Sequence, residues 1–347
     1  MPTFADILPA NRPLLVLAPM QAITNLPFWR VMQHYGGADL YYTEYLRVHR
    51  DSTPERHILR DIDANPTGRP VIAQMIGQDI PALLRTAHAL QRHAIFGIDL
   101  NLGCPAPIVC RKNAGGGLLK NLDHIDAILR ALRPVIGVQF TVKTRIGYDA
   151  PEEFDRLLEI FAAHQIDAFT VHGRTVRELY RTRVHLDRIR QAVERLDAPV
   201  FANGNVLSVA LGRETLAATG AAGLMIGRGA IRNPWLFQQI RDDALGRTVF
   251  EPTLRDLRGY IDHLAAETRQ PGLNESDSIS KLKRYMNFIG QGIGPEEAFL
   301  SGIRRAATEK EFLDLCDRHL NNDAPFPAEP PVRALLCSRS EALAVDS

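Results

Sequence analysis

Five short segments carry reactive or charged side chains, and four of them also contain glycines that let the chain turn. In chain order they are Asn-Leu-Gly-Cys-Pro at 101–105, Lys-Thr-Arg at 143–145, His-Gly-Arg at 172–174, Asn-Gly-Asn at 203–205 and Gly-Arg-Gly at 227–229. A thiol can act as a nucleophile or as a proton donor. Lysine, arginine and the backbone N–H groups of glycine loops bind anions. Together the segments predict a site for an anionic ligand beside a reactive thiol.

The last two of these segments predict a phosphate site. Each has glycine where backbone N–H groups must approach an anion, and Arg228 adds a planar donor of permanent charge. The structural alternative is that the glycines only serve tight turns.

Lys143 predicts a negative group nearby, because an unpaired ammonium is costly to desolvate. A phosphate, a carboxylate or the pyrimidine edge of a reduced flavin would each satisfy it, since a flavin collects negative charge at N1 and its C2 carbonyl on reduction. The structural alternative is a salt bridge at the rim of the site.

Cys104 lies between Gly103 and Pro105, on a turn, which favours a chemical role over the usual packing role of a buried cysteine. The other three cysteines, Cys110, Cys316 and Cys337, are interpreted as packing residues. No C-x-x-C pair is present, so we expect neither a zinc site nor a redox dithiol, and no metal.

The elements that must position these side chains alternate between strand and helix. Short β-rich runs lie at 14–20, 40–46, 71–77, 97–103, 140–147, 168–173, 200–204 and 223–227. Helical periodicity lies between them at 81–93, 124–132, 151–164, 186–196 and 206–219, with a less clear helix within 51–62. This alternation predicts an α/β fold, a (β/α)8 TIM barrel, in which strand ends build the site. A Rossmann fold is disfavoured because no G-x-G-x-x-G follows the first strand.

The strand pattern stops near Asp242, and helical stripes follow it. We predict a barrel over 1–245, a small all-helical C-terminal domain over 246–321, with a capping box at 308–311, and a loop or flexible tail over 322–347. Lys281, Lys283 and Arg284 lie on the polar side of one stripe. They are either a solvated helix face or contacts to phosphates.

Composition excludes several classes of protein. The chain has 347 residues, of which 45% are hydrophobic and 23% charged, and a net charge of +1. These values are typical of a globular protein and not of a disordered or collagen-like one. Without an apolar run of about 18 residues or a signal-peptide pattern at its start, we expect a cytoplasmic protein that does not contact membranes.

The motifs, taken together, resemble the tRNA-dihydrouridine synthases. The resemblance rests on Ala-Pro-Met-Gln at 18–21, Thr-Glu-Tyr-Leu-Arg-Val at 43–48, Asn-Leu-Gly-Cys-Pro at 101–105, the triple glycine at 115–117, Lys-Thr-Arg at 143–145, Val-His-Gly-Arg-Thr at 171–175, Ala-Asn-Gly at 202–204 and Met-Ile-Gly-Arg at 225–228. It covers about residues 14 to 240, and the helical tail corresponds to the family's tRNA-binding domain.

The resemblance implies FMN at the barrel mouth, NADPH as electron donor and a D-loop uridine of tRNA as substrate. Hydride passes from flavin N5 to C6 of the uracil ring, and Cys104 matches the cysteine that gives a proton to C5. The flavin-contacting positions correspond to Pro19, Met20, Gln21, Gln74, Lys143, His172, Asn203, Gly204, Asn205, Gly227 and Arg228. The candidate substrate-binding residues are Asn101, Arg145, Arg174, Lys281, Lys283 and Arg284. We expect a monomer.

The sequence departs from the family pattern in two places. The family usually has an acidic residue where Asn205 stands, and often Glu or Ala where Gln21 stands. Three segments most resemble the bacterial subfamily lettered C: residues 43–48, the triple glycine, and Lys-Leu-Lys-Arg at 281–284. Arg111 and Lys112 look more like type B, which leaves the target uridine open. A preference for NADPH over NADH is also open, because no dinucleotide fingerprint is present.

Two rival functions share the same site. One is an FMN-dependent reductase of a free pyrimidine or other small enone, which would not require the helical tail. The other is a non-enzymatic RNA-binding protein, which would not require Cys104, Lys143 and both glycine loops.

Overall fold

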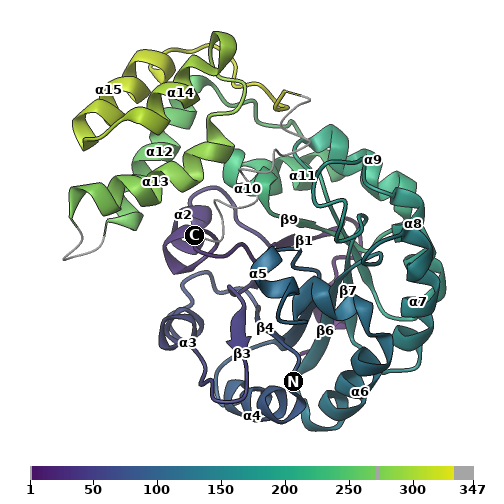
Figure 1. Ribbon diagram of the computed structural model, residues 1–347. Helices are drawn as coiled ribbons and strands as arrows, with labels where there is room; N and C mark the ends of the chain where they lie inside the picture. Colours follow the sequence, from purple (N-terminus) through teal and green to yellow (C-terminus); the bar gives the residue numbers. More distant parts are fainter. Residues whose placement is uncertain (1, 270–273, 332–347) are drawn as a thin grey trace.

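The computed structural model describes residues 2–269 and 274–331 (Figure 1). Cys337 and the end of the predicted tail lie outside the described residues.

A closed parallel barrel forms the larger part of the protein (Figure 1). Its strands are β1 (Leu14–Leu17), β2 (Leu40–Tyr42), β3 (Leu46–Val48), β4 (Val71–Gly77), β5 (Gly97–Leu102), β6 (Gln139–Arg145), β7 (Ala168–His172), β8 (Val200–Asn203) and β9 (Gly223–Ile226). The order β2-β1-β9-β8-β7-β6-β5-β4-β3 closes because β2 also pairs with β4. The predicted (β/α)8 barrel is confirmed.

The second position of the barrel differs from the prediction of one strand over 40–46. Two short strands, β2 and β3, both pair in parallel with β4. Between them the Thr43 hydroxyl, and not a backbone carbonyl, accepts the N–H of Gln74 at 3.1 Å. A side-chain hydroxyl therefore takes the place of one backbone acceptor in the sheet. The pattern of apolar residues could not predict this interruption of the strand.

Helices surround the barrel on its outside (Figure 1). They are α2 (Leu26–Gln33), α3 (Arg56–Asp63), α4 (Ile80–Leu90), α6 (Leu122–Leu132), α7 (Phe154–Ala162), α8 (Leu186–Arg195), α9 (Val209–Thr219) and α11 (Leu236–Ala244). Side chains of Asp79, Asn121 and Ser208 accept backbone N–H groups at the starts of α4, α6 and α9. These caps satisfy donors that a helix start leaves free. The short α1 (Phe4–Ile7) brings Phe4 against Phe96 and Phe201 in the barrel interior.

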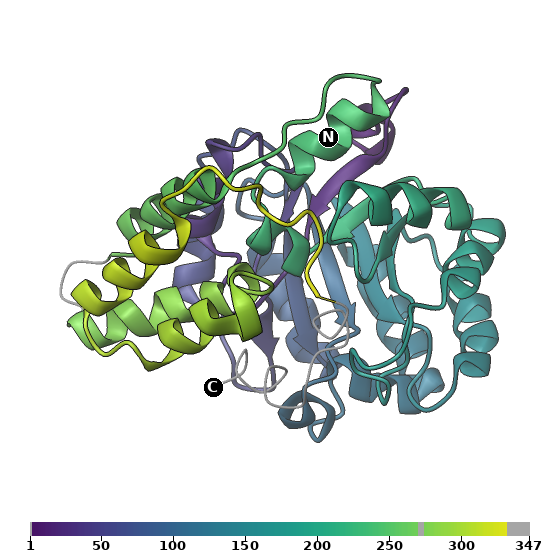
Figure 2. The same ribbon diagram turned by 90° about the horizontal axis from the view of Figure 1, so that it is seen from above.

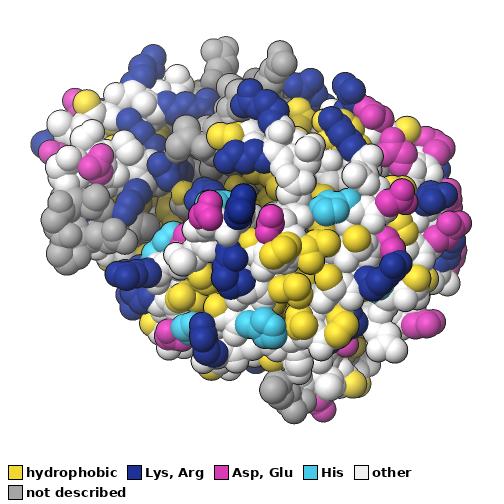
Figure 3. Space-filling model, turned by 60° about the horizontal axis from the view of Figure 1, so that its bottom comes forward, with side chains coloured by type: hydrophobic (Ala, Val, Ile, Leu, Met, Phe, Trp, Pro, Cys, Tyr) yellow, Lys and Arg dark blue, Asp and Glu magenta, His cyan; other side chains and the backbone are white. Residues whose placement is uncertain are grey.

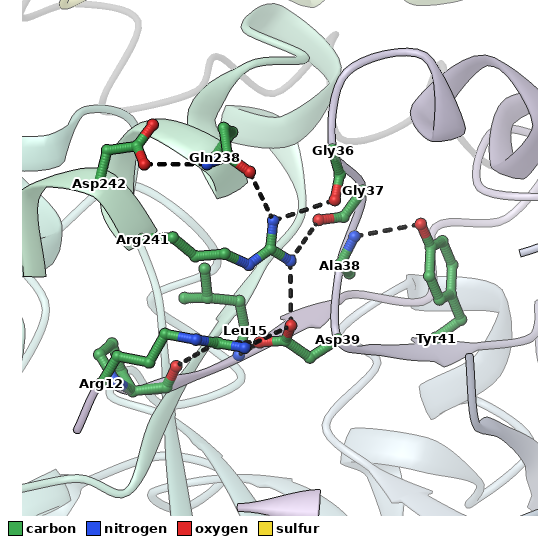
Figure 4. A network of polar contacts seen from close by, with 11 residues as sticks. Arg12, Leu15, Gly36, Gly37, Ala38, Asp39, Tyr41, Gln238, Arg241 and Asp242 are labelled. Atoms are coloured by element: carbon green, nitrogen blue, oxygen red, sulfur yellow. Dashed lines mark hydrogen bonds and ion pairs between the residues drawn. The ribbon is translucent and has the colours of Figure 1, made fainter. Parts of the chain in front are cut away.

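The start of the barrel is held by a buried ion network (Figure 4). Asp39, just before β2, accepts two hydrogen bonds from Arg12 at 2.6 and 3.0 Å and one from Arg241 of α11 at 3.0 Å. Arg241 also donates to the carbonyls of Gly36 and Gly37. Burial raises the pKa of Asp39, but the bonds from Arg12 and the charge of Arg241 outweigh it and leave the pKa below its usual value. The network joins the first and last parts of the barrel.

The residues after α11 form α12 (Leu254–Thr268), α13 (Glu275–Ile289), α14 (Ala298–Arg305) and α15 (Glu309–Leu320), which lie beside the barrel (Figure 2). The predicted capping box is present: Thr308 Oγ1 accepts the N–H of Glu311 at 3.2 Å, and Glu311 accepts the N–H of Thr308. Two buried tyrosines attach these helices to the barrel, since Tyr260 donates to the carbonyl of Ile231 and Tyr285 to that of Ile23.

Residues 322–331 run back across the barrel without forming a helix (Figure 2). Phe326 is buried, and its ring lies 4.3 Å from the guanidinium carbon of Arg232. Glu329 accepts a hydrogen bond from Ser208 at 2.7 Å. This part of the predicted tail is thus a packed loop. None of the described helices is long and apolar enough to cross a membrane.

Candidate functional site

A cavity of about 670 Å³ opens where the barrel strands end. Most of the predicted site residues line it: Pro19, Met20, Gln21, Asn101, Cys104, Lys143, Arg145, His172, Asn203, Gly204, Asn205, Gly227 and Arg228. They come from six different strands, because the carboxyl ends of parallel strands meet at one mouth. The volume is within the usual range for a small-molecule site.

The loops after β8 and β9 are tied to each other at one side of the cavity. Arg228 Nη2 donates to Asn205 Oδ1 at 2.9 Å, and Asn203 Nδ2 donates to the carbonyl of Met225 at 2.8 Å. Gly204 has φ +127°, a conformation that other residues rarely adopt. The two loops therefore place Arg228 beside Gly204 and Gly227 in the cavity lining, the residue types that an anion site requires.

The turn that carries Cys104 is held from two sides. Asn101 Oδ1 accepts the N–H groups of Gly103 and Cys104, both at 2.9 Å. On the other side Gly116 donates its N–H to the Cys104 carbonyl at 2.9 Å. A Cβ on Gly116 would lie 2.8 Å from that carbonyl oxygen, so only glycine fits this approach. Cys110 is buried and its thiol donates to the same carbonyl at 3.6 Å, a packing role as predicted.

Lys143 is half-buried in the cavity wall. Burial and the charge of Arg145 lower its pKa to about 8, while the charges of Asp99 and Cys104 oppose the shift. Within the described part of the chain no carboxylate lies at ion-pair distance from its ammonium, so the alternative of a rim salt bridge is not observed. The cavity can therefore offer this cation to an anionic edge of a ligand.

Arg145 lines the cavity but uses its guanidinium to hold loops. It donates to the carbonyls of Gly103, Thr175 and Leu179 at 2.8 to 2.9 Å. One side chain thus connects the Cys104 turn with the loop after β7.

His172 and Arg174 form a pair beside it. Arg174 Nη1 lies 3.2 Å from His172 Nε2, and a guanidinium can only donate. His172 must accept there, so it is neutral and carries its proton on Nδ1. Burial and the surrounding cations hold the pKa of His172 well below its usual value, in agreement with this tautomer.

Some predicted residues lie outside the cavity lining. Gln74 is fully buried below it, and Arg174 is fully buried and donates to the carbonyl of Thr182. Lys281, Lys283 and Arg284 lie on α13. Lys283 donates to the carbonyls of Arg304 and Ala306 at the end of α14, which makes it a helix C-cap and commits its charge to that role.

Sequence reasoning missed several lining residues: Tyr45, Arg177, Leu179, Tyr180, Arg181 and Phe288. The Tyr180 ring centroid lies 5.2 Å from the guanidinium carbon of Arg145 and 5.0 Å from that of Arg228. The sequence signal that could have identified Tyr180 is an aromatic residue between Arg177 and Arg181 in the loop after β7. Phe288 comes from α13, so the helices contribute directly to the cavity.

Lys281 and Arg284 share a row on α13 with Phe288, because residues three, four and seven apart lie on one face of a helix. Since Phe288 reaches the cavity, this row faces the barrel mouth. The face in Figure 3 is hollowed beside the helices, and Lys and Arg side chains lie around the hollow.

Gln21 lines the cavity. Its Nε2 donates to Glu44 Oε2 at 3.2 Å. Burial raises the pKa of Glu44 to about 7. An amide at position 21 therefore gives this buried carboxyl group a donor, which a second carboxylate could not supply.

Comparison with known proteins identifies the family of this chain. The family model described as dihydrouridine synthase matches residues 16–322. The "tRNA-dihydrouridine synthase B" of Pasteurella multocida is 31% identical over 308 residues, covering 86% of this chain and 90% of that protein. The "tRNA-dihydrouridine(16) synthase" of Haemophilus influenzae is 33% identical over 312 residues, covering 86% and 97%.

Among solved structures, histamine dehydrogenase from Rhizobium sp. 4-9 is similar with a TM-score of 0.54 and 11% identity, covering 92% of this chain and 65% of that one. At this identity the likeness concerns the fold alone. The match of the family model along nearly the whole barrel and the helices after it leaves one assignment: the chain is an oxidoreductase that belongs to the dihydrouridine synthase family.

Proposed function

We propose that this enzyme is a tRNA-dihydrouridine synthase that holds FMN in the cavity, uses NADPH as reductant and reduces the C5=C6 bond of a D-loop uridine. The observation that carries the proposal is one cavity that combines the Cys104 turn, the cation of Lys143 and the Arg228 anion site. The names of the relatives from Pasteurella multocida and Haemophilus influenzae support the same reaction and substrate.

The residues of the cavity fit FMN. A flat flavin needs an apolar slot with polar groups at its ends, and this cavity has room for one drug-sized ligand. Met20 packs against Gly227 in the cavity lining, where a Cβ would lie 3.0 Å from its sulfur, so glycine permits this close approach. Arg228 and the two glycine loops would hold the phosphate. Lys143 would face the pyrimidine edge, and His172, neutral and protonated on Nδ1, would add an uncharged donor.

FMN, when bound, supplies the hydride for C6 of the uracil ring. The residues of this chain have two other tasks. Lys143 stabilises negative charge that develops at the edge of the site. Cys104 delivers the proton that C5 needs, and the hydrogen bonds that Asn101 accepts from Gly103 and Cys104 hold its turn in one orientation. A uridine must leave its stack to enter the cavity, so base extrusion is part of the reaction.

The placement of α13 favours tRNA over a free pyrimidine or small enone. Phe288 closes part of the cavity, and Lys281 and Arg284 lie on the same helix row. A small substrate would need no cations along the approach to the cavity, whereas an RNA brings phosphates there. We expect the enzyme to act as a monomer in the cytoplasm, where tRNA is modified.

Mass spectrometry of D-loop fragments from cells with and without the gene tests the proposal. In cells with the gene, one D-loop uridine should be heavier by two mass units, because dihydrouridine carries two more hydrogens. In cells without the gene, the same position should have the mass of unmodified uridine, and this position identifies the target. Purified protein should be yellow and release FMN. Unchanged dihydrouridine at every D-loop position would contradict the proposed substrate.

A further inference from the structure

A polar layer lies inside the barrel just below the cavity, and the proposed chemistry does not use it. Gln74 of β4, Asp99 of β5 and Thr141 of β6 are register neighbours across three adjacent strands. All three are fully buried. A buried carboxyl group is unfavourable unless other groups hydrogen-bond to it.

Asp99 is the first acceptor of a hydrogen-bond chain that ends at Cys104. Its Oδ2 accepts from Gln74 Nε2 at 2.8 Å. Gln74 Oε1 accepts from Asn101 Nδ2 at 2.9 Å, and Asn101 Oδ1 accepts the N–H of Cys104 at 2.9 Å.

When Asp99 is ionised the chain has a fixed direction, because a carboxylate can only accept. With Asp99 at its base, the nitrogen of Gln74 must point down and its oxygen up. The oxygen of Asn101 must then point to the Cys104 turn. One buried acceptor thus orients two amide side chains and the turn that they support.

The same carboxyl group acts on Lys143 through its charge. Lys143 follows Thr141 by two residues on β6, so both side chains point to the barrel interior. Thr141 Oγ1 donates to Asp99 Oδ1 at 2.6 Å, and the charge of Asp99 raises the pKa of Lys143.

The other groups around this pair are few. Tyr42 of β2 faces Asp99. Arg145 and Cys104 face Lys143 from the cavity side, and His172 of the neighbouring strand β7 also lies within reach of its charge. Burial raises the pKa of Asp99 to about 7, while the bonds from Thr141 and Gln74 and the charge of Lys143 oppose the shift. Of the three side chains whose charges shift the pKa of Lys143, which are Arg145, Asp99 and Cys104, Asp99 alone is a carboxyl group.

We propose that Asp99 is a positioning residue with two effects: its charge keeps Lys143 protonated, and its acceptor atoms orient the Gln74–Asn101 chain that holds the Cys104 turn. The meaning of both effects for catalysis rests on the proposed function. The effect on Lys143 itself is a property of the chain and can be measured without flavin or tRNA.

The direct test is the pKa of Lys143 in the flavin-free protein, followed by NMR of ¹³Cε-lysine. The chain has only six lysines, and Lys143→Arg assigns the signal. We expect Asp99→Asn to lower the pKa of Lys143 by about one pH unit, the lower end of what a neighbouring opposite charge produces. The asparagine keeps the shape and can still bond Gln74 and Thr141, so the charge is the main change.

Two substitutions at the same layer complete the design. Thr141→Ser keeps the hydroxyl and should leave the pKa of Lys143 in place. Thr141→Val removes the hydrogen bond that favours the ionised Asp99, so it should lower the pKa of Lys143 in the same direction but by less. Thr141→Val decides the question if Asp99→Asn does not fold. An unchanged Lys143 signal in the folded variants would overturn the charge effect.

The orienting effect is tested with Gln74→Met, which interrupts the chain and leaves Asp99 in place. We expect the pKa of Lys143 to fall no further than in Thr141→Val, because Gln74 also gives Asp99 one hydrogen bond. Uridine reduction by the FMN-loaded enzyme should be at least about tenfold slower than in Thr141→Val, a small part of the usual worth of a general acid. Wild-type uridine reduction in Gln74→Met would overturn this effect. If wild-type protein binds no flavin, the proposed function fails, but the Lys143 measurement still stands.

Discussion

Replacement of Asn205 by Asp should weaken the binding of FMN through its phosphate. Asn205 Oδ1 accepts a hydrogen bond from Arg228 Nη2 at 2.9 Å, and this neutral acceptor leaves the guanidinium its full charge. A carboxylate in the same place would neutralise Arg228 and compete with the phosphate. Asn205 has φ +53°, which Asp also tolerates, so the loop should keep its shape.

The expected loss follows from one weakened bond between charged partners. Such a bond contributes about 1.5–3 kcal/mol, and each 1.4 kcal/mol is tenfold in affinity. Asn205→Asp should therefore raise the Kd for FMN by about 10- to 100-fold. The measurement is flavin fluorescence during titration of the flavin-free protein.

Riboflavin, which lacks the phosphate, is the matched control ligand. Its affinity should be the same for Asn205→Asp and wild type. An unchanged Kd for FMN, or an equal loss for both ligands, would refute the assignment of the phosphate to these loops.

Three further outcomes are expected. Lys143→Ala should lower the flavin content of purified protein or slow flavin reduction by NADPH, and in wild type this reduction should slow as the pH rises past about 8, where Lys143 loses its proton. Lys281→Glu with Arg284→Glu should weaken tRNA binding and reduce the slope of log Kd against log salt by about one per phosphate contact, without changing NADPH oxidation in the absence of tRNA. Asp39→Asn should lower the free energy of unfolding by about 3 kcal/mol in denaturant titrations at pH 7, because it unpairs buried guanidinium groups, whereas Asp243→Asn at an exposed ion pair should have little effect.

The pH dependence of the Asp39 network has a definite sign. The folded-state pKa of Asp39 is below its ordinary value of 3.8, so its contribution is complete at neutral pH. The contribution should be lost only as the pH falls below about 4 and through the lowered pKa.

The barrel and most of the cavity lining could be predicted from the sequence. Parallel strands gather their carboxyl ends at one mouth, so any polar residue that ends a strand is a candidate. Cys104, Lys143 and Arg228 were found in this way, and the structure places all three in the cavity lining.

The features of the site that the sequence did not predict depend on contacts between distant parts of the chain. Lys283 looks like a free cation in sequence, but the end of α14 lies beside it and accepts its hydrogen bonds. Phe288 belongs to a helix assigned to RNA, and only packing brings it to the cavity. Asp99 lies inside an apolar strand, and its partners come from two other strands. No local pattern reports such neighbours.

The role of Cys104 is the central claim, and single-turnover kinetics of the Cys104→Ala variant test it most directly. With FMN bound, the variant should be reduced by NADPH, because that half-reaction needs no proton from the thiol. Uridine reduction in tRNA by the reduced variant should then be slower by about 10² to 10⁴, the usual worth of a general acid. Cys110→Ser, which keeps a donor for the Cys104 carbonyl, should stay close to wild type. Uridine reduction at the wild-type rate in Cys104→Ala, or an equal loss in Cys110→Ser, would contradict the assignment of Cys104 as the proton donor.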